Sequence, residues 1–196
     1  MKRFVGLILF FIAVTTHAQI EGAVTGNHWV GTWATAQQPV VRSFMPYNNN
    51  MSGRSVRQIV KVSIGGKQLR LELSNELSRE PLVIRSVYIA HAIDSCAIEP
   101  SSAKYLKFNG NYNTVIPAGK SRFSDALTFD LQPLERLAIT INYDKAPRVP
   151  TVHMGSRTTS YILRGVSTPK TSFDKAFRED HWFNISAIDV FNLTAK

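Results

Sequence analysis

The 196-residue chain carries a formal net charge of +9, has 44% hydrophobic residues and contains a single cysteine. That length and apolar content suit one globular domain with a sizeable core, and a single cysteine excludes an internal disulfide framework. The basic residues are scattered and form no run or aromatic–basic block, which argues against a nucleic-acid-binding module. The positive charge instead indicates a solvated surface, which could face anionic envelope material.

The first 18 residues have the pattern of a secretory signal peptide. Lys2 and Arg3 precede an apolar run over residues 4–14, and small residues around Ala18 offer a cleavage site. The run is too short to span a membrane comfortably, so no membrane span is expected; an uncleaved anchor is the alternative. The expected mature protein is one domain over residues 19–196, exported to the periplasm or the extracellular space.

Alternating apolar residues recur along the mature chain and predict strands. A first strand is expected over residues 29–36, then a loop over residues 40–50, then two strands within SVRQIVKVSIGGKQLRLELSNE, residues 55–76. The pair Gly65–Gly66 predicts a two-residue primed turn, and therefore a hairpin. The register of that hairpin places Ile64 opposite Lys67, Val62 opposite Leu69 and Val60 opposite Leu71.

Further short strands are expected between clusters of turn-forming residues. They fall at residues 81–92, 104–108, 114–116, 126–131, 136–143, 158–163 and 186–191. Mixed phases over residues 81–92 indicate burial on both faces or a bulge, and only residues 172–183 have a spacing compatible with a short helix. About nine or ten strands at this spacing predict an all-β fold, a single antiparallel β-sandwich of jelly-roll type with little helix.

No familiar catalytic or cofactor-binding motif occurs in the sequence. There is no Gly-x-Ser-x-Gly elbow, no phosphate-binding loop and no dinucleotide fingerprint after a strand. No histidine has a second ligand at zinc-site spacing, so neither a metal nor a cofactor is expected. No serine lies in a strand-to-helix turn that would expose it as a nucleophile. The residues therefore predict no catalytic residue, and Cys96 is expected to be a buried, inert thiol.

Several blocks occur in an order typical of one protein family. The blocks are VGTWATAQQP, VRQIVKVSIGGKQLRLELSNE, PLVIRSVYIA, IPAGKSRFSDALTFDL, ERLAITINY and YILRG. They resemble the N-terminal β-domain that precedes the catalytic domain in secreted GDSL-type (SGNH) hydrolases, and the resemblance covers residues 29–191. It implies an accessory domain of an esterase acting on acylated carbohydrate or lipid-like esters, with the SGNH catalytic domain as its partner.

The catalytic blocks of that family are absent from this sequence. Such enzymes carry Gly-Asp-Ser with the nucleophilic serine and a late Asp-x-x-His, whereas this chain stops at Lys196, soon after FNISAIDVF, without either. No catalytic residue can therefore be carried over. Two interpretations stay open: a shortened product or fragment of a two-domain hydrolase, or a stand-alone exported carbohydrate-binding β-sandwich module.

Three residues are candidates for contact with a substrate. Asn75 follows a strand and could reach a substrate, or it could cap the next turn. His153 in PTVHMG is placed in a loop between strands with the same two alternatives, and Trp182 could offer a sugar-stacking platform or pack against another domain. Trp33 is expected to pack in the core.

An exposed docking face is expected near the C-terminal end of the domain. A sandwich that packs against a hydrolase domain leaves an apolar patch in water when that domain is missing. The expected patch consists of the aromatic residues Phe173, Phe177, Trp182, Phe183 and Phe191. Concentration-dependent self-association is the expected consequence, relieved by adding the missing domain in trans or by Phe183→Ser if that ring is exposed.

Overall fold

The computed structural model describes residues 28–192, so the expected signal peptide lies outside the described part. Strands dominate this part, and its helical segments are three short 3-10 turns. The strands are β1 (His28–Ala34), β2 (Gln38–Pro39), β3 (Arg54–Lys61), β4 (Gly66–Ser74), β5 (Leu82–His91), β6 (Lys104–Tyr105), β7 (Thr114–Ile116), β8 (Ser121–Phe123), β9 (Leu127–Leu131), β10 (Arg136–Lys145), β11 (Thr151–Met154), β12 (Ser160–Arg164), β13 (Phe177–Glu179), β14 (His181–Phe183) and β15 (Ile185–Asn192). The 3-10 turns are η1 (Arg42–Phe44), η2 (Pro46–Asn49) and η3 (Pro100–Ser102).

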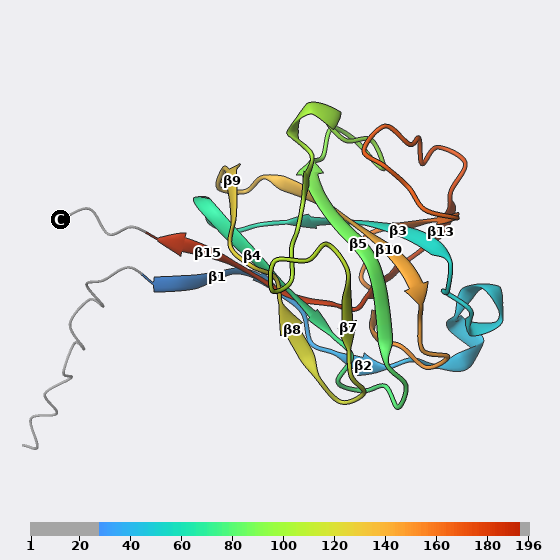
Figure 1. The fold of residues 1–196 in the computed structure, drawn as a ribbon. Helices are drawn as coiled ribbons and strands as arrows, with labels where there is room; N and C mark the ends of the chain where they lie inside the picture. The colour runs from blue at the N-terminus through green and yellow to red at the C-terminus, as the bar shows by residue number, and fades with distance from the viewer. Residues whose placement is uncertain (1–27, 193–196) are drawn as a thin grey trace, which may run out of the picture.

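Two larger sheets form the sandwich, and all strand pairs are antiparallel (Figure 1). One sheet has the order β1-β15-β4-β8, with β9 also pairing with β4. The other has the order β13-β12-β3-β10-β5-β6, with β7 also pairing with β5. A small third sheet, β14-β11-β2, lies at one end. The prediction of an all-β sandwich with little helix is confirmed.

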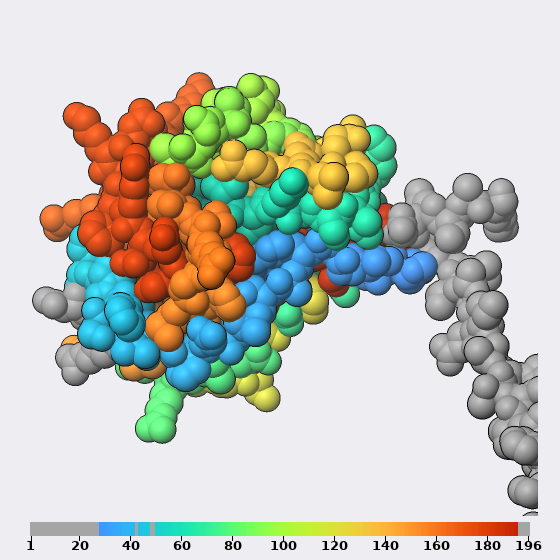
Figure 2. Space-filling view, turned by 180° about the vertical axis from the view of Figure 1, so that it is seen from behind, coloured from blue at the N-terminus to red at the C-terminus, as the bar shows by residue number. Residues whose placement is uncertain are grey.

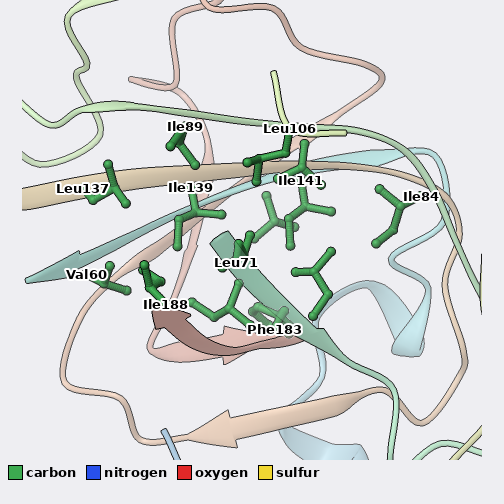
Figure 3. Close-up of a cluster of buried hydrophobic side chains, with 14 of the residues drawn as sticks. Val60, Leu71, Ile84, Ile89, Leu106, Leu137, Ile139, Ile141, Phe183 and Ile188 are labelled. Atoms are coloured by element: carbon green, nitrogen blue, oxygen red, sulfur yellow. The ribbon is translucent and has the colours of Figure 1, made fainter. Parts of the chain in front are cut away.

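The main core lies between the two larger sheets. Leu71 of β4 and Ile188 of β15 face Ile139 and Ile141 of β10, and all four side chains are buried (Figure 3). Burying each such side chain stabilises the fold by about 1.5–3 kcal/mol. The alternation over residues 136–143 is confirmed, because every second side chain of this strand from Leu137 points into the main core.

A second, smaller core covers the outer face of the seven-stranded sheet. Residues 92–103 and 165–176 form loops over this face, and Cys96 and Phe173 from these loops pack with Tyr161 and other sheet residues. The sheet is thus buried on both sides over much of its area. The burial on both faces expected for residues 81–92 is found in β5, where a bulge also interrupts the register with β10.

The predicted hairpin over residues 55–76 is wrong. β3 pairs with β10 and β12 in the seven-stranded sheet, whereas β4 pairs with β15, β8 and β9 in the other sheet. The connection is therefore an arch that carries the chain from one sheet to the other. Its backbone is held by β1, since Ser63 N–H donates to the carbonyl of Thr32 and Ile64 N–H donates to the Thr32 hydroxyl.

The glycine pair is needed for space rather than for a primed turn. Neither Gly65 nor Gly66 has a positive φ. A Cβ on Gly65 would lie 2.3 Å from the carbonyl oxygen of Leu131, and a Cβ on Gly66 would lie 2.9 Å from Cβ of Val190. Both glycines therefore permit a close backbone approach where the arch crosses the other strands.

Two further expectations are wrong. Residues 172–183 form no helix; they contain β13 and β14, because Phe177 and Phe183 belong to strands that pair with β12 and β11. His153 does not lie in a loop but in the middle of β11. The segment over residues 40–50, predicted as a loop, contains η1 and η2.

Candidate functional site

Asn75 is enclosed by protein. Its side chain is 0% exposed, and Nδ2 donates to the carbonyl oxygens of Glu80, Ile116 and Pro117 at 2.8, 3.1 and 3.2 Å. The amide joins the end of β4 to the turns before β5 and after β7. This geometry favours the turn-capping role of Asn75 over contact with a substrate.

His153 and Trp182 are brought together in the small third sheet. They are directly opposed on β11 and β14, with ring centroids 5.5 Å apart. His153 is held from the other side by the carbonyl of Ala36, 2.7 Å from Nδ1. Trp182 also packs edge-on against Trp33, with centroids 4.9 Å apart. Two of the three candidate residues thus form one cluster, and Asn75 is not part of it.

Trp182 is half-buried in this cluster and contributes to packing. Within residues 28–192 its indole N–H is buried and has no hydrogen-bond partner. Trp33 packs against the main core, as expected, together with Trp182. A ring held between Trp33 and His153 offers a sugar less face than a free platform does. Trp182 packs within this domain, whereas the alternative stated from the sequence is packing against another domain.

Beside this cluster lies a set of exposed apolar side chains, here called the apolar patch: Val41, Phe44, Tyr47 and Phe177. Their exposed fractions are 45, 58, 39 and 46%. Phe44 approaches the ring of His181 on β14, and Tyr47 lies 5.3 Å from Phe177 on β13. In Figure 2 the cyan segment that carries η1 and η2 lies beside the orange and red segments of β11 to β14. Two segments far apart in the sequence therefore build one surface.

The apolar patch differs from the docking face expected from the sequence. Of the five rings in that expectation, Phe173 and Phe183 are buried at 1% exposure, and Phe177 alone is classed as exposed. Phe191 packs against Trp29 with ring centroids 5.2 Å apart. Val41, Phe44 and Tyr47 lie outside that expectation, because the sequence pattern predicts only a loop over residues 40–50. The apolar content of VVRSFMPY, unusual for a solvated loop, is the signal that could have identified them.

The rings of His91, His153 and His181 have defined contacts, and within the described residues none of these three rings contacts a serine hydroxyl. Nδ1 of His91 is paired with the carboxylate of Glu135, and that ring lies 4.7 Å from Phe129. Nδ1 of His181 lies 2.7 Å from the carbonyl of Asp180. The carboxylate of Glu135 therefore holds the ring of His91, and backbone carbonyls hold the other two rings, as is common for structural histidines.

Cys96 lies in the second core. Burial, followed by the hydrogen bond to Asp174 and the negative charge of that carboxylate, raises the pKa of the Cys96 thiol. A raised pKa means a smaller thiolate fraction at neutral pH, and the thiolate is the nucleophile. This environment is that of an inert thiol.

We expect native Cys96 to react with iodoacetamide at pH 7.5 more slowly than the urea-unfolded chain, since burial restricts access to the thiol and its raised pKa lowers the thiolate fraction. Asp174→Asn should raise the native rate, because it removes the negative charge beside the thiol. Asp130→Asn, which changes a distant exposed carboxylate, is the matched control. A native rate equal to that of the unfolded chain would contradict the assignment.

Among residues 28–192 no three His, Cys, Asp or Glu side chains gather as a metal site would require. The same residues contain no helix long and apolar enough to cross a membrane.

A scan of the chain against protein-family models finds no match. A search of curated proteins likewise finds none that matches. The resemblance to SGNH hydrolases therefore rests on the sequence blocks quoted above.

Proposed function

We propose that this chain is the accessory, non-catalytic β-domain of a secreted SGNH-type esterase. In this proposal an SGNH catalytic domain hydrolyses carboxylic esters of acylated carbohydrates or lipid-like substrates, and the β-sandwich supports that domain. The ordered sequence blocks over residues 29–191 and the all-β sandwich support the family assignment.

The observation that carries the supporting role is the apolar patch. Exposed apolar residues that gather from separate segments mark interaction surfaces, and aromatic side chains are enriched at the centres of such surfaces. Two contacts tie the patch to neighbouring elements: Arg54 stacks on the ring of Tyr47 at 3.6 Å, and Val41 N–H contacts the sulfur of Met154. The Arg54 contact restricts the ring of Tyr47 before a partner binds, which lowers the entropic cost of association.

The test is association in trans with the isolated catalytic domain of a two-domain secreted SGNH esterase. We expect the purified chain to form a complex with that domain on analytical ultracentrifugation. The double variant Phe44→Ser/Tyr47→Ser should weaken the complex at least about tenfold, because truncation of aromatic anchors commonly costs 2 kcal/mol or more.

The matched control is Tyr105→Ser/Tyr112→Ser. These two tyrosines are also exposed, and their ring centroids are 6.0 Å apart, but they lie on and beside β6, away from the patch. The control should bind as the unmodified chain does. Failure to associate with SGNH domains, or equal losses in both double variants, would refute the docking role.

The carbohydrate-binding module is the competing proposal, and it predicts a different result. A glycan affinity gel would then retard the chain, and Trp182→Ala would abolish the retardation. Self-association through the apolar patch is a third outcome, visible as concentration-dependent sedimentation that Phe44→Ser/Tyr47→Ser removes. Phe183→Ser is unsuitable for that purpose, because Phe183 is buried and its loss would unfold the core.

A further inference from the structure

A pocket of about 360 Å³ lies on the outer side of the seven-stranded sheet, where Ile59 and Tyr161 of the second core line it. The end of β3, the start of β10 and the loop between β11 and β12 contribute one cation each: Lys61, Arg136 and Arg157. The hydroxyl-bearing side chains of Thr158 and Tyr161 line the same pocket. A single carboxylate, Asp94, faces these three cations across it.

The three cations have no ion-pair partner, as is the case for most lysines and arginines of the described residues. Lys67, Arg70 and Arg85 each form an ion pair with an aspartate, at 2.7, 2.7 and 3.2 Å. Within residues 28–192 no carboxylate lies within 4.0 Å of the charged nitrogens of the three pocket cations. The carboxylate of Asp94, although it lines the pocket, is also farther away than this. The pocket therefore holds an excess of positive charge that the protein itself does not neutralise.

Strand register places two of these positive charges side by side. Lys61 and Arg136 are directly opposed in the β3–β10 ladder, and like charges in directly opposed positions destabilise a sheet. Arg157 has a φ of +54°, and Ser95, across the pocket, has a φ of +39°. Both are non-glycine residues in the sparsely populated left-handed region, which is a strained backbone conformation. Residues with such strain cluster at ligand sites.

We propose that this pocket binds a compact oxyanion, that is, a carboxylate, sulfate or phosphate group. An oxyanion between three cations would remove their mutual repulsion, and a guanidinium offers paired N–H donors that match two oxygens of such a group. Hydroxyls at the pocket wall can orient the rest of the ligand. Carboxylate, sulfate and phosphate groups would be bound by the same contacts, and they differ in the molecule to which the anionic group is attached.

The experiment is calorimetric titration of the purified chain with three probes: trigalacturonate, inorganic sulfate and inorganic phosphate. We expect binding that weakens as sodium chloride is raised, because salt screens the attraction of exposed charges. Lys61→Gln/Arg136→Gln should weaken binding about tenfold or more, and Arg157→Asn should also weaken it. Asparagine adopts positive φ readily, so Arg157→Asn removes the charge and keeps the loop conformation.

A second readout separates ligand binding from a structural role. With no probe present, Lys61→Gln/Arg136→Gln should melt at the same temperature as the unmodified chain or a higher one, because it removes the opposed like charges. Lys67→Gln/Arg85→Gln is the control, since it lowers the net charge by the same amount away from the pocket. If only trigalacturonate binds, an acidic glycan is the ligand, whereas binding of the free ions shows that the oxyanion alone suffices. No binding by any probe at 10 mM, or equal losses in the control, would overturn the proposal.

Discussion

Arg57→Ala should lower the free energy of unfolding by about 3–5 kcal/mol, among the larger effects of any single substitution in this fold. The side chain is 1% exposed, and no carboxylate pairs with it among the described residues. Its guanidinium donates to the carbonyl of Cys96, the hydroxyl of Thr140 and the hydroxyl of Tyr88 at 2.6, 3.1 and 3.1 Å. It also stacks on the ring of Phe173 at 3.9 Å. Alanine would leave these acceptors buried without their donors, beside a cavity.

Urea-induced unfolding measures this loss of stability, and two further variants separate its causes. Arg57→Met keeps most of the volume and removes the donors, so we expect a smaller loss of about 1–3 kcal/mol. Arg85→Ala removes an exposed arginine paired with Asp144 and should cost no more than about 1 kcal/mol. An Arg57→Met variant more stable than the unmodified chain would show that burying the charge costs more than its hydrogen bonds return.

Gly65→Ala should be the most damaging substitution of a glycine, with a loss of about 3 kcal/mol or more, or failure to fold. The added Cβ would lie 2.3 Å from the carbonyl oxygen of Leu131 and 3.0 Å from the carbonyl carbon of Gln132. These are backbone atoms of the turn between β9 and β10, so the contact cannot be relieved by a side-chain rotation.

Gly31→Ala is the matched control for this prediction. Gly31 lies in β1, and its added Cβ would meet only Oδ1 of Asp189 at 3.8 Å, an ordinary contact. Alanine there should leave stability within about 1 kcal/mol of the unmodified chain. Thermal unfolding followed by circular dichroism compares the two variants. Equal behaviour of Gly65→Ala and Gly31→Ala would refute the close-approach explanation.

Local patterns predicted strands better than they predicted how the strands pair. The alternation from Leu137 to Tyr143 correctly identified a core face, because period-two burial is a property of the strand itself. The Gly65–Gly66 pair correctly marked a chain reversal but not an arch. Hairpin and arch differ in whether β3 bonds to β4 or to β10 and β12, and that choice depends on residues far away in the sequence.

The same limit applies to the candidate sites. His153 and Trp182 were each identified from the sequence, but their contact requires the pairing of β11 with β14. The opposition of Lys61 and Arg136 requires the register of β3 with β10, which joins residues 75 positions apart. Scattered basic residues in the sequence thus become a local concentration of charge only through long-range register.

The position of β15 has a consequence for the order in which the protein can fold. β15 lies between β1 and β4, so the last described strand is an interior strand of its sheet and bonds to the first. During synthesis β1 and β4 have no partner between them until residues 185–192 emerge. Folds dominated by such distant pairings form slowly, and this sheet stays incomplete while residues 185–192 are missing. The interior place of β15 therefore makes completion of this sheet a late step, which follows the synthesis of nearly all of the described residues.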